Sequence, residues 1–282
     1  MDFKLIETGP KLSKFYNYLA NEGISIIAMD FECEFNLHAY GEKLCLIQIF
    51  DGKTYFIIDP LNIENDEIKK FLLDKNTVKI MYGAESDASL VYSQYGTQIQ
   101  NLFDLQIAVD VLDAERNGLD FALDHFLDIE IKNKKKYQSH NWTTRPIRID
   151  AMEYALNDVA HLFKLKDILM EQVKSKNKYE ELLYEILRKN FIPAKEKIPG
   201  LLKRFEYKKL SAPKKELFKK LFDIRESFAK EYDLPPFHIL NNDILFDLVN
   251  RIKNLNDIKL SGRLSGESQD KMRHMMEEAL RA

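Results

Sequence analysis

The 282-residue sequence has little cysteine, a single tryptophan and no long apolar run. Two cysteines, Cys33 and Cys45, are too few for a disulfide framework or a four-cysteine zinc site, so we expect two buried thiols. No stretch approaches the roughly 18 unbroken apolar residues of a membrane span. The first residues also lack a charged segment followed by an apolar one. We therefore expect a cytoplasmic protein without a membrane partner.

The composition is that of a folded protein, with 45% hydrophobic and 31% charged residues. The length predicts one large and one small domain. The net charge of −3 is unevenly spread, because residues 195–220 carry ten Lys or Arg against three Glu, which leaves −10 for the remainder. Such a basic strip suits an enzyme that holds a phosphate backbone beside a metal site. An ordinary solvated helical face is the alternative.

Two acids stand at the end of a predicted buried strand. The apolar run 24–29 follows the turn signal Asn21-Glu22-Gly23 and contains β-branched residues, which favours a strand over a helix. Asp30 and Glu32 then break the run. Because side chains two apart in a strand share a face, both carboxylates should point to one spot while Phe31 packs behind them. Like charges placed together raise each other's pKa unless a cation lies between them, so the pattern predicts a site for a hard metal ion.

The remaining pattern predicts an α/β domain with a mixed sheet, followed by a compact helical unit. We expect strands at 3–6, 24–32, 44–50, 54–58 and 78–82. We expect helices at 12–19, 64–73, 85–92, 101–112 and 119–126, a long helix from after Pro146 to about 173, and, in the helical unit, helices at 214–232, 239–252 and 268–280. The charged stretch between the two parts reads as a helical linker.

Three further residues complete a pattern with Asp30 and Glu32. Asp87 lies in the first turn of a predicted helix, and Tyr154 and Asp158, four residues apart, share one face of the long helix. Taken singly, each acid is explained as a solvated or capping residue. Together they read D-x-E, a later Asp, and Y-x-x-x-D.

This joint pattern resembles the DEDDy branch of the DnaQ-like 3′-5′ exonucleases. Residues 20–172 are similar to ribonuclease D in order and spacing, through the segments Leu44–Gln48, Ile58–Leu61, Asn101–Ala108 and Trp142 with Arg145-Pro146. Ile224–Glu226 and Leu234–Asp243 resemble an HRDC domain. One departure is that Tyr82 or Gly83 stands where the family usually has a histidine.

The resemblance implies an RNase H-like mixed sheet of five or six strands flanked by helices, followed by a small all-helical HRDC-like domain. The expected domains are an exonuclease domain at 1–175, a basic helical linker at 176–210 and an HRDC-like nucleic-acid-binding domain at 211–282.

The resemblance also implies two divalent cations, Mg²⁺ or Mn²⁺. Asp30 would bridge both ions, Glu32 and Asp158 would hold the ion on the side of the nucleophile, and Asp87 would support the other through water. The Tyr154 hydroxyl would orient the attacking water. A phenol with a pKa near 10 is a poor base, which argues against general-base catalysis by Tyr154.

Substrate contacts are expected after the first motif and on the basic strip. Phe31, Cys33 and Tyr40 lie in the segment expected to meet the terminal nucleotide. Tyr40 either stacks on a base or is a half-buried loop aromatic. Arg145 either contacts phosphate or forms a structural salt bridge. Lys203 and Arg204 would guide RNA.

By resemblance, the expected function is a 3′-5′ exoribonuclease of the ribonuclease D type that releases nucleoside 5′-monophosphates. Its substrates would be single-stranded RNA 3′ ends, such as those of tRNA precursors, with no obligate protein partner. A DNA exonuclease is the first alternative, since a metal site alone does not read the 2′-hydroxyl. A non-catalytic RNA-binding scaffold is the second, and the five intact motif positions disfavour it.

Overall fold

The computed structural model describes residues 2–130, 137, 139–190 and 198–281. The chain forms two compact units. The first comprises Met1–Cys33 with Lys43–Glu196, and the second comprises Glu34–Glu42 with Lys197–Ala282. Within the described residues, no helix is long and apolar enough to cross a membrane.

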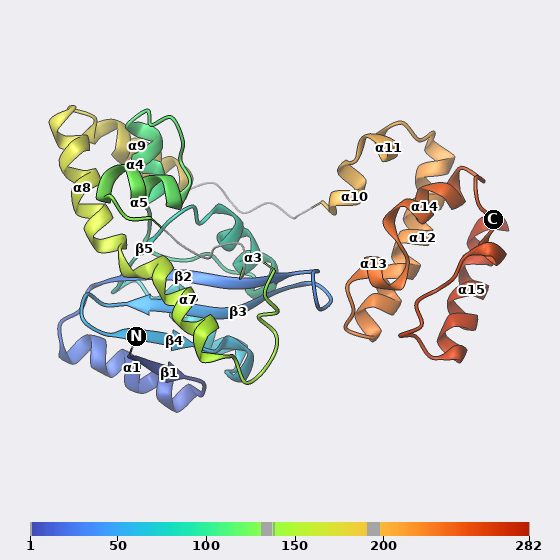
Figure 1. Ribbon diagram of the computed structural model, residues 1–282, viewed down its shortest axis with the longest axis horizontal. Coiled ribbons are helices and arrows are strands. Elements are labelled where there is room, and N and C mark those ends of the chain that lie inside the picture. Colours follow the sequence, from blue (N-terminus) through green and yellow to red (C-terminus); the bar gives the residue numbers. More distant parts are fainter. Residues whose placement is uncertain (1, 131–136, 138, 191–197, 282) are drawn as a thin grey trace. The chain divides into compact units, whose positions relative to one another are not determined.

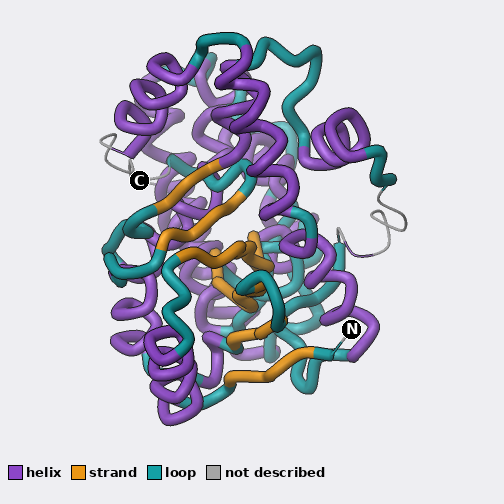
Figure 2. Tube along the Cα trace, turned by 90° about the vertical axis from the view of Figure 1, so that its left-hand side faces the viewer, coloured by secondary structure: helices purple, strands orange, loops and turns teal. Residues whose placement is uncertain are grey.

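A six-stranded mixed sheet forms the centre of the first unit, in the order β1-β4-β3-β2-β5-β6 (Figure 1). Its strands are β1 (Phe3–Ile6), β2 (Ile26–Phe35), β3 (Glu42–Phe50), β4 (Tyr55–Ile58), β5 (Val78–Met81) and β6 (Leu102–Asp104). β4 runs antiparallel to β3 and parallel to β1, while β5 is parallel to both β2 and β6. The strands are the orange segments of Figure 2. The predicted mixed sheet is confirmed, with six strands.

Helices cover both faces of this sheet. The helices are α1 (Gly9–Asn21), α2 (Asn65–Leu73), α3 (Glu85–Tyr95), α4 (Leu105–Val111), α5 (Leu119–Leu127), α7 (Ile149–Ala160), α8 (Leu162–Ser175) and α9 (Tyr179–Asn190). Apolar residues of α1, α2 and α3 form one core cluster with Met29 and Phe31. Residues of α4, α5, α7, α8 and α9 form the other, with Ala28. The period-2 alternation of β2 thus divides its side chains between two cores.

Two helices predicted for the first unit differ from the structure. Residues 102–104 are strand β6, paired with β5 from Lys79 to Met81, and only then does α4 begin. Asp104 ends the strand and caps the helix, because its side chain accepts the Gln106 N–H at 3.0 Å. The predicted long helix is two helices that meet at His161, and both bury apolar residues in the same core cluster.

α9 lies in a stretch expected to be a linker. Its Leu182 is 2% exposed and belongs to the core cluster shared by α7 and α8. The segment 179–190 is therefore packed onto the first unit. The sequence did not reveal this, because charged residues surround its few buried positions.

The second unit is helical. It contains α10 (Gly200–Lys203), α11 (Phe205–Lys208), α12 (Ala212–Glu231), α13 (Pro236–Ile239), α14 (Asn242–Val249) and α15 (Gly266–Arg281). The helix expected at 239–252 is interrupted, since Asn241 caps a new helix by accepting the Asp243 N–H at 2.9 Å. Phe218, Leu221 and Met272 lie at the centre of its core.

Candidate active site

The two acids of β2 face the helix layer that contains α7. Ala28 lies in the core cluster of α7 and α8, whereas Met29 and Phe31 lie in the opposite cluster. Alternation along the strand therefore puts Asp30 and Glu32 on the Ala28 side. Both are partly buried, and Phe31 is 6% exposed behind them. The structure thus confirms the packing that the sequence predicted for Phe31.

Asp87 reaches the same site from the first turn of α3. The turn before this helix is held by Asp104, whose carboxylate accepts the N–H groups of Gly83 at 2.8 Å and Ala84 at 3.0 Å. Gly83 has φ of +67°, a conformation that favours glycine. The positioning role of Asp104 was missed from the sequence, although an Asp just before a helix is a capping signal that could have revealed it.

Four carboxylates act on one another at this site. Burial raises the pKa of Asp30 well above its ordinary value, and the negative charges of Asp158, Asp87 and Glu32 raise it further. Burial also raises the pKa of Glu32, with Asp158 and Asp87 adding to the effect. The structure therefore brings together all four acids that the sequence selected. Their charges reach one another although they come from β2, α3 and α7.

The donor set fits a hard divalent cation, because all four side chains offer carboxylate oxygens and a cation would relieve their repulsion. As the side chains stand, no group of three or more His, Cys, Asp or Glu within the described residues is close enough to form an ion-binding cluster.

Tyr154 lies beside the acids on α7. Burial raises the pKa of its phenol, and the charges of Asp158 and Glu32 raise it further, so the hydroxyl keeps its proton at neutral pH. Its ring stacks on Tyr137 with centroids 4.4 Å apart. The Tyr137 hydroxyl in turn donates to Asp150 at 3.2 Å. Nothing in the spacing of the sequence marks Tyr137 as a support for Tyr154.

Arg145 forms a structural network. Its Nε and Nη2 donate to the two carboxylate oxygens of Asp59 at 2.6 and 2.7 Å. Nη2 also donates to the Cys45 carbonyl at 2.8 Å, and Nη1 donates to the carbonyls of Trp142 and Thr144 at 2.6 and 3.1 Å. All five N–H donors of the guanidinium are used. The geometry supports the salt-bridge alternative and ties the segment before α7 to β3 and to the end of β4.

The other predicted substrate residues are distributed over both units. Cys33 is partly buried, and burial together with the Asp87 charge raises the pKa of its thiol. Tyr40 belongs to the second unit, where its N–H donates to Asp233 at 3.2 Å and its side chain packs against the helical core. Lys203 and Arg204 are exposed, and Arg204 pairs with Asp243 at 2.9 Å. Their contacts with a substrate stay predictions.

The comparison with family models is decisive for the first unit. A 3′-5′ exonuclease model matches residues 3–174, which contain all four acids and Tyr154. The chain therefore belongs to the 3′-5′ exonuclease family. An HRDC domain model matches residues 214–281 of the same chain. Both family resemblances seen in the sequence are confirmed.

Relatives of this exonuclease include exosome complex component 10 of Mus musculus and ribonuclease D of Desulfotalea psychrophila. The first is 24% identical over 79% of this chain, which spans about a quarter (27%) of that relative's length. The second is 27% identical over 86% of this chain and 66% of its own length.

Solved structures show the same fold. The catalytic core of RRP6 from Trypanosoma brucei superimposes with a TM-score of 0.77 at 23% identity, covering 99% of this chain and 80% of that one. Escherichia coli RNase D gives a TM-score of 0.74 at 22% identity, covering 99% and 75%.

Proposed function

We propose that this exonuclease hydrolyses RNA from the 3′ end with two divalent cations, Mg²⁺ or Mn²⁺, and releases nucleoside 5′-monophosphates. The observation that carries the proposal is the cluster of four carboxylates, in which burial and the charges of the neighbouring acids raise the pKa values of Asp30 and Glu32. Titratable groups arranged in this way are typical of functional sites. The domain at 1–175 would supply the chemistry, and the domain at 211–282 would bind nucleic acid.

RNA is the proposed substrate because the relatives named above include a ribonuclease D and because the chain carries a basic strip. Trimming of the 3′ ends of tRNA or other stable RNA is the proposed role. The described part of the strip lies on and around α10, α11 and α12, outside the unit that holds the carboxylates. A basic surface on the helical unit suits the proposed binding of a phosphate backbone by that unit.

In the proposed mechanism Asp30, Glu32, Asp87 and Asp158 hold the ions. Divalent ions so bound acidify an attacking water and stabilise the departing 3′ oxygen. Asp30, Glu32 and Asp158 would hold the cation that activates the attacking water, and Asp30 with Asp87 would hold the cation that stabilises the leaving oxygen. Tyr154, kept protonated by its raised pKa, would orient the attacking water by hydrogen bonding and would not remove its proton.

The test is release of labelled mononucleotide from 3′-labelled single-stranded RNA and DNA with Mg²⁺ or Mn²⁺, for the wild-type protein and Asp30→Ala. We expect 5′-monophosphates from RNA with the wild-type protein and none with the variant. Release that survives in Asp30→Ala would contradict the mechanism. Cleavage of DNA in preference to RNA would change the proposed substrate, and no release from either would favour an RNA-binding scaffold.

A further inference from the structure

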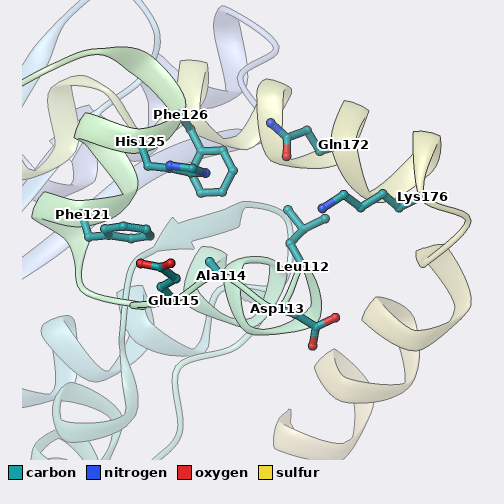
Figure 3. A pocket seen from close by; sticks show the side chains of 9 residues that line it. All are labelled: Leu112, Asp113, Ala114, Glu115, Phe121, His125, Phe126, Gln172 and Lys176. Atoms are coloured by element: carbon teal, nitrogen blue, oxygen red, sulfur yellow. The ribbon is translucent and has the colours of Figure 1, made fainter.

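A second concave site lies on the exonuclease unit, between α5, the C-terminal end of α8 and the loop after α4. It is a cavity of about 350 Å³ (Figure 3). Tyr154 and Asp158 lie on α7, which precedes the opposite end of α8, and α8 is 14 residues long. The residues that line the cavity include neither the four acids nor Tyr154, so the cavity is distinct from the carboxylate cluster. The two sites are neighbours through α5, because the charge of Asp120, next to Phe121, raises the pKa of Tyr154.

One wall of this cavity is aromatic. Phe121 and His125, one helical turn apart on α5, stack with centroids 5.1 Å apart and ring planes 10° from parallel. Phe126 meets the edge of the His125 ring at 4.7 Å. Figure 3 shows these three rings along one side of the cavity. His125 is exposed to solvent, so a planar ligand can reach the stacked pair.

The remaining walls carry a few polar groups of both signs. Lys176, just after α8, is exposed and lines the cavity together with Gln172. Glu115 lies next to Phe121, on the side of the cavity away from Lys176 (Figure 3). Asp113 points away from the rings in Figure 3 and forms an ion pair with Lys178, which leaves Lys176 as the cation and Glu115 as the anion that a ligand would meet.

We propose that this cavity binds a purine nucleotide, with its base stacked on Phe121 and His125 and its phosphate beside Lys176. Stacking on aromatic side chains is how proteins hold single-stranded bases. Glu115 accepts hydrogen bonds from base amino or imino groups, and Gln172 can donate and accept. A purely cationic ligand would meet Lys176, and a purely anionic one would leave the rings unused. A purine nucleotide can contact the aromatic rings, the lysine and the polar side chains at once. Its size suits this cavity, which is at the small end of known ligand pockets.

The nucleotide can come from within an RNA chain or from solution, and the experiment separates these sources. The full chain, as Asp30→Asn with ¹³C-labelled histidine, is titrated in EDTA with AMP, GMP, adenosine and an eight-nucleotide oligoadenylate. His125→Gln identifies the His125 signal. Because neither metal nor turnover is needed, the result does not depend on the proposed exonuclease mechanism.

We expect AMP or GMP to shift the His125 signal through the ring current of the stacked base. Adenosine should bind about fivefold more weakly, because it lacks the phosphate that Lys176 meets. Lys176→Ala should weaken AMP binding by a similar factor, whereas Lys174→Ala, which removes an exposed lysine of the last turn of α8 outside the cavity, should not. Phe121→Leu should weaken AMP and adenosine alike. Unchanged signals from the other histidines show that each variant is folded.

Tighter binding of oligoadenylate than of AMP would assign the cavity to the RNA path, and the reverse would assign it to free nucleotide. Either result supports a nucleotide site. The proposal is overturned if millimolar AMP, GMP and oligoadenylate all leave the His125 signal unmoved, or if Lys176→Ala and Lys174→Ala behave alike. A shift produced by an arginine-rich peptide but by no nucleotide would also overturn it and would indicate a protein contact.

Discussion

Two groups of charged side chains in the exonuclease unit are arranged in opposite ways. Around Arg145, five N–H donors meet five oxygens, two of them from the Asp59 carboxylate. At the acid site, the charges from the described residues that act on Asp30 and Glu32 come from other carboxylates. Compensated charge holds a fold together, whereas clustered like charge destabilises it and is retained for function. The comparison therefore separates a structural group from a functional one.

The largest expected effect is on turnover. Asp158→Asn keeps the size of the side chain but removes one negative charge from the proposed ion site. We expect the rate of 3′-end hydrolysis to fall on the order of 10³-fold, as when one member of a catalytic unit is lost. Asp167→Asn, an exposed acid of α8 paired with Lys166, is the matched control and should retain full activity. Equal rates for the two variants would show that the acid cluster is not catalytic.

Loss of Arg145 should instead reduce stability. Arg145→Met leaves Asp59, whose side chain is 7% exposed, without its cationic partner and with only the donors of Leu61 and Asn62. We expect the free energy of unfolding to fall by about 3–5 kcal/mol. Arg148→Met removes an arginine whose side chain is 74% exposed and should cost under about 1 kcal/mol. Trp142, the only tryptophan, lies in this unit, so its fluorescence during urea unfolding measures both. Equal losses would contradict a structural role for Arg145.

The pH dependence of stability should show the cost of the acid cluster. Carboxyl groups with a raised pKa bind more protons in the folded state, so the stability they contribute is lost as pH rises from about 4 through their raised pKa values. In EDTA, the melting temperature of the wild-type protein should therefore fall relative to that of Asp30→Asn as pH increases. Exposed acids such as Asp113, whose pKa is lowered by Lys178, change both proteins equally and cancel in this difference. Parallel melting curves across pH would mean that the carboxylates do not repel.

The sequence predicted the parts of this site that depend on local pattern. Strand periodicity placed Asp30 and Glu32 on one face and Phe31 on the other, and helical spacing placed Tyr154 with Asp158. The supports for these residues come from contacts distant in the chain, which no local pattern shows. Asp104 reaches back to Gly83 and Ala84, and Tyr137 stacks on Tyr154.

The same limit explains the errors in the fold. Apolar residues at 102 and 103 continue the helical pattern of α4 backwards, yet pairing with β5 makes them a strand. The sequence also could not decide whether Arg145 contacts phosphate or forms a structural salt bridge, because its partner Asp59 is 86 residues away in the chain.

The smallest expected effect concerns the basic strip. Changing Lys203, Arg204, Lys208 and Lys209 to Ala should weaken binding of long RNA and reduce the slope of log affinity against log salt by up to about 0.7 per lost phosphate contact. Turnover at saturating RNA should stay nearly unchanged. Lys14 and Lys53, exposed lysines of the exonuclease unit, provide the control variants. If the four-residue variant binds long RNA as tightly as the wild-type protein, the basic strip is an ordinary solvated surface.

The central claim, that the four carboxylates are kept close for a divalent cation, is tested most directly by thermal unfolding with and without Mg²⁺. Removing one charge should stabilise the metal-free protein by ~1 kcal/mol, about one pKa unit of repulsion. In EDTA, Asp30→Asn should therefore melt about 2–4 °C above the wild-type protein. Saturating Mg²⁺ should raise the melting temperature of the wild-type protein and leave that of Asp30→Asn almost unchanged. A wild-type protein that melts at the same temperature with and without Mg²⁺ or Mn²⁺, and no lower than Asp30→Asn, would contradict the claim.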